Sequence, residues 1–169
     1  MSNLILDAQN ITKSFTEGKS SVDVIRGLSL QVKAGEFVSI VGSSGSGKSL
    51  LAHAILGILP YNAKVSGIMK FQGELMDEKK ISELRGKEIA FVPQSTLYLD
   101  PLMKVGEQVR RGQKDRESVM RCRQSMGRYG LGEDTEELYP FELSGGMTRR
   151  VLISTAVMEH PRLVIADEP

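Results

Sequence analysis

The sequence has little that would tie the protein to an oxidising compartment, a polyanion or a lipid bilayer. Its only cysteine is Cys122, so no disulfide can form within the chain, and a lone thiol fits a reducing compartment. The 22 basic residues nearly balance the 21 acidic ones, and a net charge of +1 would not by itself hold the chain on nucleic acid or an anionic membrane. The longest apolar stretch, residues 50–61, contains His53 and Pro60 and is too short to cross a bilayer. Residues 1–10 do not resemble a secretory leader, so we expect a cytosolic protein.

Length and patterning indicate one domain. A chain of 169 residues, 40% of them hydrophobic, is long enough for one core and too short for two domains of ordinary size. Alternating residues at 4–12 and 22–32 predict two strands of an antiparallel sheet. The β-rich run 36–41 predicts a strand that ends in a glycine cluster, and residues 48–58 have the apolar spacing of a helix. Strand, glycine loop and helix therefore follow one another directly.

The middle of the chain contains one long polar insert. Strands are predicted at 65–71 and 88–92, with a short helix at 78–84 between them. From residue 94 to residue 143 the β signal disappears, and the residues are polar, charged and helix-forming. This segment is predicted to be an inserted helical subdomain, followed by a helix over 145–159.

The glycine cluster has the pattern of a phosphate-binding P-loop. It matches that pattern at every defined position, through Gly42, Ser43, Ser44, Gly45, Ser46, Gly47, Lys48 and Ser49. The glycines let consecutive backbone N–H groups turn toward phosphate oxygens at a helix N-terminus, whose dipole also favours an anion. Lys48 is expected to contact the β- and γ-phosphates of a nucleotide, and the Ser49 hydroxyl to ligate Mg²⁺. A flexible Gly/Ser linker is the alternative, and the flanking strand and helix disfavour it.

A pair of carboxylates follows the last apolar run. Residues 163–166 are all apolar, which is typical of a buried parallel strand, and Asp167 and Glu168 come next. Open α/β sheets bind ligands at this end of their strands. Asp167 is expected to hold Mg²⁺ through water, and Glu168 to polarise the attacking water as general base. A surface acidic pair is the alternative, and a P-loop in the same chain disfavours it.

A third motif precedes the helix predicted over 145–159. Its residues are Leu143, Ser144, Gly145, Gly146 and Met147, and they form a helix start with close backbone access, hence a second anion site. Alone, such a sequence is a common helix start. Between a helical insert and a carboxylate pair, it resembles the signature motif of ABC ATPases. In that family the signature of one subunit closes on the γ-phosphate bound to the P-loop of another, so the resemblance implies a second ABC ATPase subunit as partner.

Two further residues match the ABC family. Gln94, after the strand predicted at 88–92, stands where the family's Q-loop glutamine senses Mg²⁺ and the γ-phosphate. Phe15 stands where an aromatic residue of the family stacks on adenine, and stacking suits an aromatic ring. An ordinary core phenylalanine is the alternative for Phe15.

The resemblance covers essentially the whole chain and implies a fold and a function. The fold class is α/β: a P-loop NTPase core with a mainly parallel sheet, an N-terminal antiparallel β-subdomain and an inserted helical subdomain. The nucleotide-binding domain occupies residues 1–169, with the core and β-subdomain at 1–93 and 144–169 and the helical subdomain at 94–143. The implied cofactors are ATP and Mg²⁺. The implied partners are permease subunits and a solute-binding protein, with no nucleic acid, at the cytoplasmic face of the membrane.

Within the family, the sequence resembles the ATPase subunits of oligopeptide, dipeptide and nickel importers. The similarity lies in Met147, Tyr139-Pro140, Leu99-Asp100-Pro101 and Val105-Gly106-Glu107-Gln108. Departures from the subgroup's pattern are Phe141, Ser95-Thr96 and Thr148-Arg149. The alternative function is a non-transport ABC ATPase of the DNA-repair or translation-factor kind. A P-loop kinase is a third possibility, but it has no use for residues 143–147.

The family's D-loop and switch histidine are expected after Glu168, outside this sequence. His53 and His160 both precede Asp167 and are expected to be ordinary surface or helix-end histidines. The family fold also places a strand between the P-loop strand and the strand at 163–166, which would otherwise leave two edges unpaired. Residues 1–169 are therefore expected to be C-terminally incomplete, unable to hydrolyse ATP alone, and either prone to aggregation or only partly folded.

Overall fold

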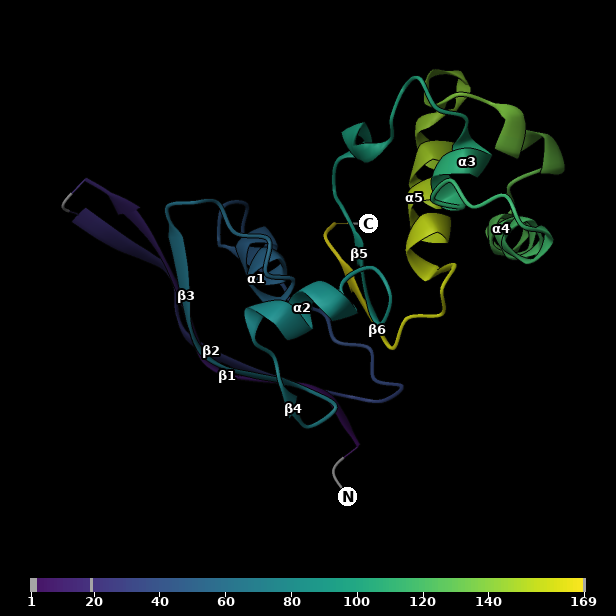
Figure 1. The fold of residues 1–169 in the computed structure, drawn as a ribbon. Helices are drawn as coiled ribbons and strands as arrows, with labels where there is room; N and C mark the ends of the chain where they lie inside the picture. Colours follow the sequence, from purple (N-terminus) through teal and green to yellow (C-terminus); the bar gives the residue numbers. More distant parts are fainter. Residues whose placement is uncertain (1–2, 19, 169) are drawn as a thin grey trace. The chain divides into compact units, whose positions relative to one another are not determined.

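The computed structural model describes residues 3–18 and 20–168, which form two compact units divided between residues 85 and 86 (Figure 1). Each unit has its own sheet: four antiparallel strands in the first and two parallel strands in the second. The elements confirm the predicted α/β class. None of the described helices is long and apolar enough to cross a membrane.

The sheet of the first unit has the order β2-β1-β3-β4. Its strands are β1 (Leu4–Glu17), β2 (Ser20–Lys33), β3 (Ala63–Phe71) and β4 (Glu74–Leu75). The three strands predicted at 4–12, 22–32 and 65–71 are confirmed and are longer than predicted, whereas the two-residue β4 was not predicted. Gly67 has a φ of +113°, and a Cβ there would lie 2.7 Å from the Asn10 carbonyl oxygen, so the close approach of β3 to β1 requires glycine.

The pairing of β1 with β2 shifts its register at several points, and one of these shifts is a bulge between Lys13 and Ser14. Lys13 is opposite Ile25, but the next residue, Ser14, is opposite Asp23, so Val24 is an extra residue on β2. Bulges bend a strand and redirect the side chains beside them. This bulge lies in the part of the sheet that faces the first helix.

Two helices accompany this sheet. Helix α1 (Lys48–Ile55) buries Leu51 and Ile55, and it ends three residues before the predicted Ile58. It ends there because Gly57 adopts a left-handed φ of +62°, and the Ile58 N–H then donates to the His53 carbonyl oxygen at 2.9 Å, which closes the helix. Helix α2 (Glu78–Leu84) has the predicted bounds, and Asp77 caps it by accepting a hydrogen bond from the Lys80 N–H at 2.7 Å.

The strand predicted at 36–41 is wrong, because the segment has no regular secondary structure. Phe37 and Val41 are 93% and 91% exposed. A strand is held by hydrogen bonds to a neighbouring strand, and none of the strands in the described part of the chain pairs with this segment. The segment therefore has the apolar composition of a strand, but no strand in the described part of the chain pairs with it to make it one.

The parallel sheet of the second unit consists of β5 (Ile89–Val92) and β6 (Leu163–Ala166). Helix α5 (Gly145–Val157) lies beside this sheet (Figure 1). It packs on the sheet through Ala156, against Ala90 and Val92 of β5. The bounds of β6 agree with the prediction, but its residues are alternately half-buried and exposed rather than fully buried. One strand neighbour and one covering helix bury only part of its surface.

The polar insert forms helices, as predicted for residues 94–143. They are η1 (Thr96–Tyr98), α3 (Val105–Val109), α4 (Arg116–Arg128), η2 (Glu133–Glu137) and η3 (Pro140–Glu142). Their apolar residues form a core with α5 that includes Val105, Val109, Cys122 and Val151. Cys122 is fully buried in α4, and this burial raises the pKa of its thiol.

A buried carboxylate joins three of these helices. Glu136 in η2 accepts hydrogen bonds from Arg123 of α4, at 2.9 Å to Nε and 2.5 Å to Nη2. Its second oxygen accepts from Arg110 Nη1, next to the end of α3, at 3.2 Å. A Cβ at Gly106 would lie 2.7 Å from the Glu136 Cβ, so α3 approaches closely only because glycine is there. Glu136 is therefore a structural link within the helical insert.

We expect Glu136→Gln to lower the free energy of unfolding by about 1–3 kcal/mol, because an amide cannot accept from both arginines and leaves a buried donor unpaired. Arg123 is largely exposed, so most of the effect comes from the Arg110 side. The melting temperature is expected to fall by about 3–10 °C. The control is Glu137→Gln, which removes the charge from an exposed carboxylate paired with Lys104. Equal melting temperatures for both variants would show that Glu136 contributes no more than a surface ion pair.

Candidate functional site

The predicted phosphate loop lies in the first unit and leads directly into α1. The Lys48 ammonium donates hydrogen bonds to the carbonyl oxygens of Gly42 at 2.9 Å and Ser43 at 3.0 Å. The lysine side chain therefore folds back along the loop that precedes it, and the two ends of the loop are held together.

The N-terminus of α1 has no side-chain cap. Gly47 is the N-cap residue, with a left-handed φ of +95°, and no acidic residue lies in the first turn. Glycine also suits the loop elsewhere: Gly45 has a left-handed φ of +78°, and a Cβ at Gly42 would lie 2.6 Å from Ser46 Oγ, so that hydroxyl would have to move. These features suit an anion that takes its hydrogen bonds from backbone N–H groups, as the phosphates of a nucleotide do.

Phe15 is half-buried on β1, in the same unit as the phosphate loop. It pairs with Val22 of β2 and Ala63 of β3. The ammonium of Lys13 lies over its ring, 5.4 Å from the ring centroid. Partial exposure leaves the ring accessible to a flat ligand, which a fully buried core phenylalanine would not be.

The second unit brings together the predicted glutamine and carboxylates. Gln94 follows β5, and Asp167 and Glu168 follow β6, so all three lie at the carboxyl end of the parallel sheet. Gln94 Nε2 donates to Glu168 Oε2 at 2.5 Å, and the Asp167 N–H donates to the Val92 carbonyl oxygen at 2.9 Å. Asp167 is buried and Glu168 is exposed. Glu168 also has a positive φ of 46°, which is uncommon for a residue other than glycine and is found at functional positions.

Arg149 makes a contact with Glu168 that was not predicted from the sequence. Its guanidinium Nη1 donates to the carbonyl oxygen of Glu168 at 2.5 Å. Arg149 lies on α5, so this contact connects the helix that begins at the signature motif with the proposed general base. The only sequence signal was that Thr148-Arg149 departs from the subgroup's pattern.

The signature motif forms the start of α5, as predicted. Ser144 is the N-cap residue, and its hydroxyl oxygen accepts a hydrogen bond from the Met147 N–H at 3.3 Å. Gly145 and Gly146 are exposed, and nothing lies within 4 Å of a Cβ built on either. The backbone at this helix start is therefore open to an approaching group.

The predicted site residues fall into two sets. Phe15 and the phosphate loop with Ser49 belong to the first unit, and Gln94, Asp167, Glu168 and the signature belong to the second. Among the residues that the structure describes, no three His, Cys, Asp or Glu side chains gather to form a metal site. Mg²⁺ bound to nucleotide takes most of its ligands from phosphates and water, so one hydroxyl and one or two polar side chains from the protein suit it.

The fold and the two sets of site residues are those of an ATP-binding cassette. Comparison with known proteins gives the same class. The chain belongs to the ABC transporter family, whose profile matches residues 25–169. It is 33% identical over 179 residues to the oligopeptide transport ATP-binding protein OppD of Salmonella typhimurium, covering 99% of this chain and 53% of OppD. It is 36% identical over 173 residues to the putative hemin import ATP-binding protein HrtA of Staphylococcus aureus, covering 98% of this chain and 76% of HrtA.

Solved structures of ABC cassettes share this fold. The dimeric structure of MJ0796, a bacterial ABC transporter cassette, matches with a TM-score of 0.84 and 28% identity, covering 96% of this chain and 73% of that chain. The structure of cbiO1 from Clostridium perfringens, part of the cbiONQ transporter complex, matches with a TM-score of 0.80 and 26% identity, covering 99% and 66%. The present chain thus spans about half the length of OppD and about three quarters of HrtA and MJ0796.

Proposed function

We propose that this chain is the motor part of an ABC transporter, which binds ATP with Mg²⁺ and hydrolyses it together with a second cassette. The observation that carries the proposal is the hydrogen bond between Gln94 and Glu168 at the end of the parallel sheet. These residues are far apart in sequence, and ATP hydrolysis needs both a sensor of the γ-phosphate and a base for the attacking water at one place. The solved structure of MJ0796 in a post-hydrolysis state, bound to ADP and Pi, supports hydrolysis as the reaction of this class.

Each side chain has a proposed role in this reaction. Lys48 contacts the β- and γ-phosphates, and Glu168 accepts a proton from the attacking water. Ser49, Gln94 and Asp167 would hold Mg²⁺, which when bound neutralises charge on the phosphates. Phe15 stacks on the nucleobase.

The signature motif is proposed to bind the nucleotide of the second cassette through Ser144, Gly145 and Gly146. Their open position at the start of α5 supports this role, since an anion could approach the backbone there without displacing a side chain. The solved structure of the MJ0796 cassette is a dimer, which supports a dimeric assembly for this chain as well.

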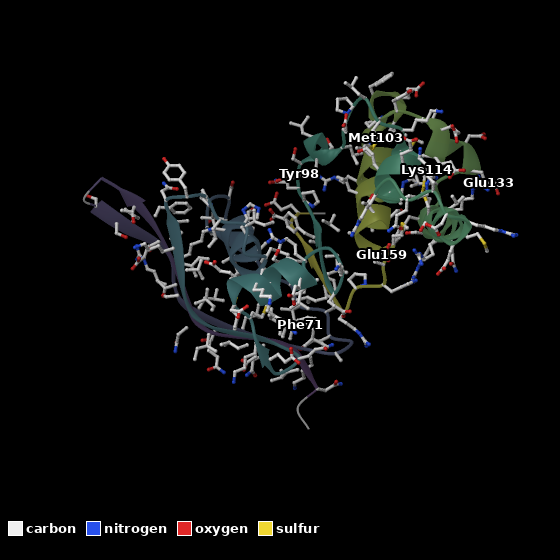
Figure 2. All side chains as sticks on the ribbon, in the orientation of Figure 1. Phe71, Tyr98, Met103, Lys114, Glu133 and Glu159 are labelled. Carbon is white, nitrogen blue, oxygen red and sulfur yellow. The ribbon has the colours of Figure 1, made fainter. Side chains whose placement is uncertain are left out.

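We propose that residues 94–143 act as the helical subdomain that receives the permease. The segment 97–103 exposes apolar side chains, among them Leu97 at 91% and Leu102 at 85%. Tyr98 and Met103 belong to the same segment and are labelled in Figure 2. Exposed apolar residues gathered in one short segment are typical of a contact surface for another protein. Through such a contact the protein would lie at the cytoplasmic face of the membrane.

Leu97→Glu and Leu102→Glu are expected to abolish stimulation of ATPase activity by the permease and to leave basal ATPase activity within about twofold of the parent, since a charge on an apolar contact opposes its burial. The measurement is ATPase activity with and without reconstituted permease. Met120→Glu is the matched control, because Met120 is an exposed apolar residue on α4 of the same unit. Loss of basal activity together with stimulation would indicate misfolding and would contradict a role limited to coupling.

The proposed solutes are peptides or nickel-type compounds. The similarity to OppD supports peptides, while HrtA, at comparable identity, carries the name of a putative hemin importer. Co-purification of the full-length protein with the permeases encoded beside its gene, followed by uptake assays with labelled peptides, Ni²⁺ and hemin, would test both the partner and the solute. Failure to bind any permease would favour the alternative, a non-transport ABC ATPase of the DNA-repair or translation-factor kind.

A further inference from the structure

Lys13 is a buried lysine in the sheet of the first unit. Its side chain is fully buried, at 0% exposure, although the residues directly before and after it in β1 are partly exposed to solvent. Among the described residues its ammonium has one hydrogen-bond acceptor, the Leu50 carbonyl oxygen at 3.3 Å, and no carboxylate forms a salt bridge with it. Burial lowers the pKa of this group. Burying a lysine without a carboxylate partner costs free energy, so the buried position of Lys13 points to a specific role.

The two contacts of the ammonium connect two predicted parts of the nucleotide site. Leu50 lies in the first turn of α1, two residues after Lys48. The ring of Phe15, two residues along β1 from Lys13, lies 5.4 Å from the same ammonium. Cations at this distance over an aromatic face are attracted to it and hold the ring in place. Because the ammonium occupies one face of the Phe15 ring, a flat ligand would have to stack on the opposite face.

The bulge between β1 and β2 brings the sheet and the phosphate loop together at the same point. Val24 is the extra residue opposite the step from Lys13 to Ser14. Its carbonyl oxygen lies 3.5 Å from the position that a Cβ of Gly47 would occupy. The last glycine of the phosphate loop therefore packs against the bulged residue of β2 that lies opposite Lys13 and Ser14. Lys13 and Gly47 therefore both lie next to this irregular stretch of the β1–β2 pairing.

We propose that Lys13 is a positioning residue that orients Phe15 for the nucleobase and fixes this aromatic face relative to the phosphate-binding helix α1. This inference rests on the proposed function, since it assigns Lys13 to the nucleobase end of the ATP site. Lys13 does not contact the nucleotide in this arrangement. Because Lys13 acts through the Phe15 ring, it affects the binding of ligands that carry a base. It does not affect the binding of phosphates that carry none.

The test compares ATP with inorganic tripolyphosphate, which has the phosphates and lacks the base. In the full-length protein, Lys13→Met is expected to weaken ATP binding about fivefold to tenfold, by loss of the cation over the ring, and to leave tripolyphosphate binding within about twofold. Phe15→Ala is expected to show the same selectivity. In the double variant the loss should not exceed that of Phe15→Ala alone, because both changes act on the same contact.

Lys64→Met is the matched control, since Lys64 is exposed on β3 of the same sheet and pairs with Ser14 rather than Lys13. Circular dichroism melts establish that each variant is folded. If Lys13→Met does not fold, Lys13→Gln decides the question, because the amide keeps a donor for the Leu50 carbonyl and removes the charge. Equal loss of ATP and tripolyphosphate, additive losses with Phe15→Ala, or unchanged ATP binding in a folded variant would each overturn the assignment. If Lys48→Ala leaves the binding of both ligands unchanged, the proposed phosphate site fails instead, whatever the Lys13 variants do.

Discussion

Lys48→Ala is expected to reduce ATP turnover of the full-length protein by about a hundredfold or more and to abolish tight ATP binding. In the structure the Lys48 ammonium lies against the carbonyl oxygens of Gly42 and Ser43, so its charge is held at the loop that would surround the phosphates. Alanine removes this cation from the first turn of α1. Because alanine is the best helix former, the fold should be retained. Turnover and binding of a fluorescent ATP analogue are the measurements.

Lys48→Arg provides a stricter comparison. Arginine keeps the positive charge but is longer and branched, and it does not reproduce the hydrogen bonds of a single ammonium to the loop. A loss similar to that of alanine would show that position matters as well as charge. Turnover of Lys48→Ala within about threefold of the parent, a difference under about 1 kcal/mol in the barrier, would contradict the proposed role of Lys48.

Glu168→Gln is expected to reduce turnover by about 10²–10⁴-fold while ATP binding is kept. The carbonyl oxygen of the new amide can still accept the hydrogen bond from Gln94 Nε2, so the arrangement at the end of β6 is preserved and only the proton acceptor is lost. The full-length variant should therefore accumulate as an ATP-bound dimer, which size-exclusion chromatography with and without ATP would detect.

The control for Glu168→Gln is Glu133→Gln, which neutralises an exposed carboxylate of the same unit in η2. It should behave as the parent in both turnover and elution. A Glu168→Gln protein that remains monomeric with ATP and hydrolyses it normally would show that another group acts as the base.

Much of the fold follows from local patterns in the sequence. Alternation predicted β1 and β2 because each strand has one face toward a core, and the bounds of α2 and β6 were predicted correctly because turn residues flank them. The site motifs were recognisable for a similar reason. A loop that binds phosphate through its backbone needs glycines at fixed spacing, and a helix that starts at Ser144 needs a side-chain cap.

Other features depend on contacts between distant parts of the chain. The apolar run 36–41 has the composition of a strand, but a strand also needs a paired neighbour, and composition does not report whether one is present. Lys13 is buried beside an irregular stretch of the β1–β2 pairing, which no local pattern indicates. The bond from Arg149 to the Glu168 carbonyl likewise depends on how α5 lies against β6. In each case the determining partner is remote in sequence.

The burial of Cys122 has a practical consequence for labelling experiments. A thiol that is fully buried and whose pKa is raised by that burial has little thiolate and little access to a maleimide. A single cysteine introduced on the surface can therefore carry a fluorophore or spin label without removal of the native one. Slow modification of Cys122 itself would then report transient opening of the helical core, and its rate would measure how strongly a bound ligand keeps that core closed.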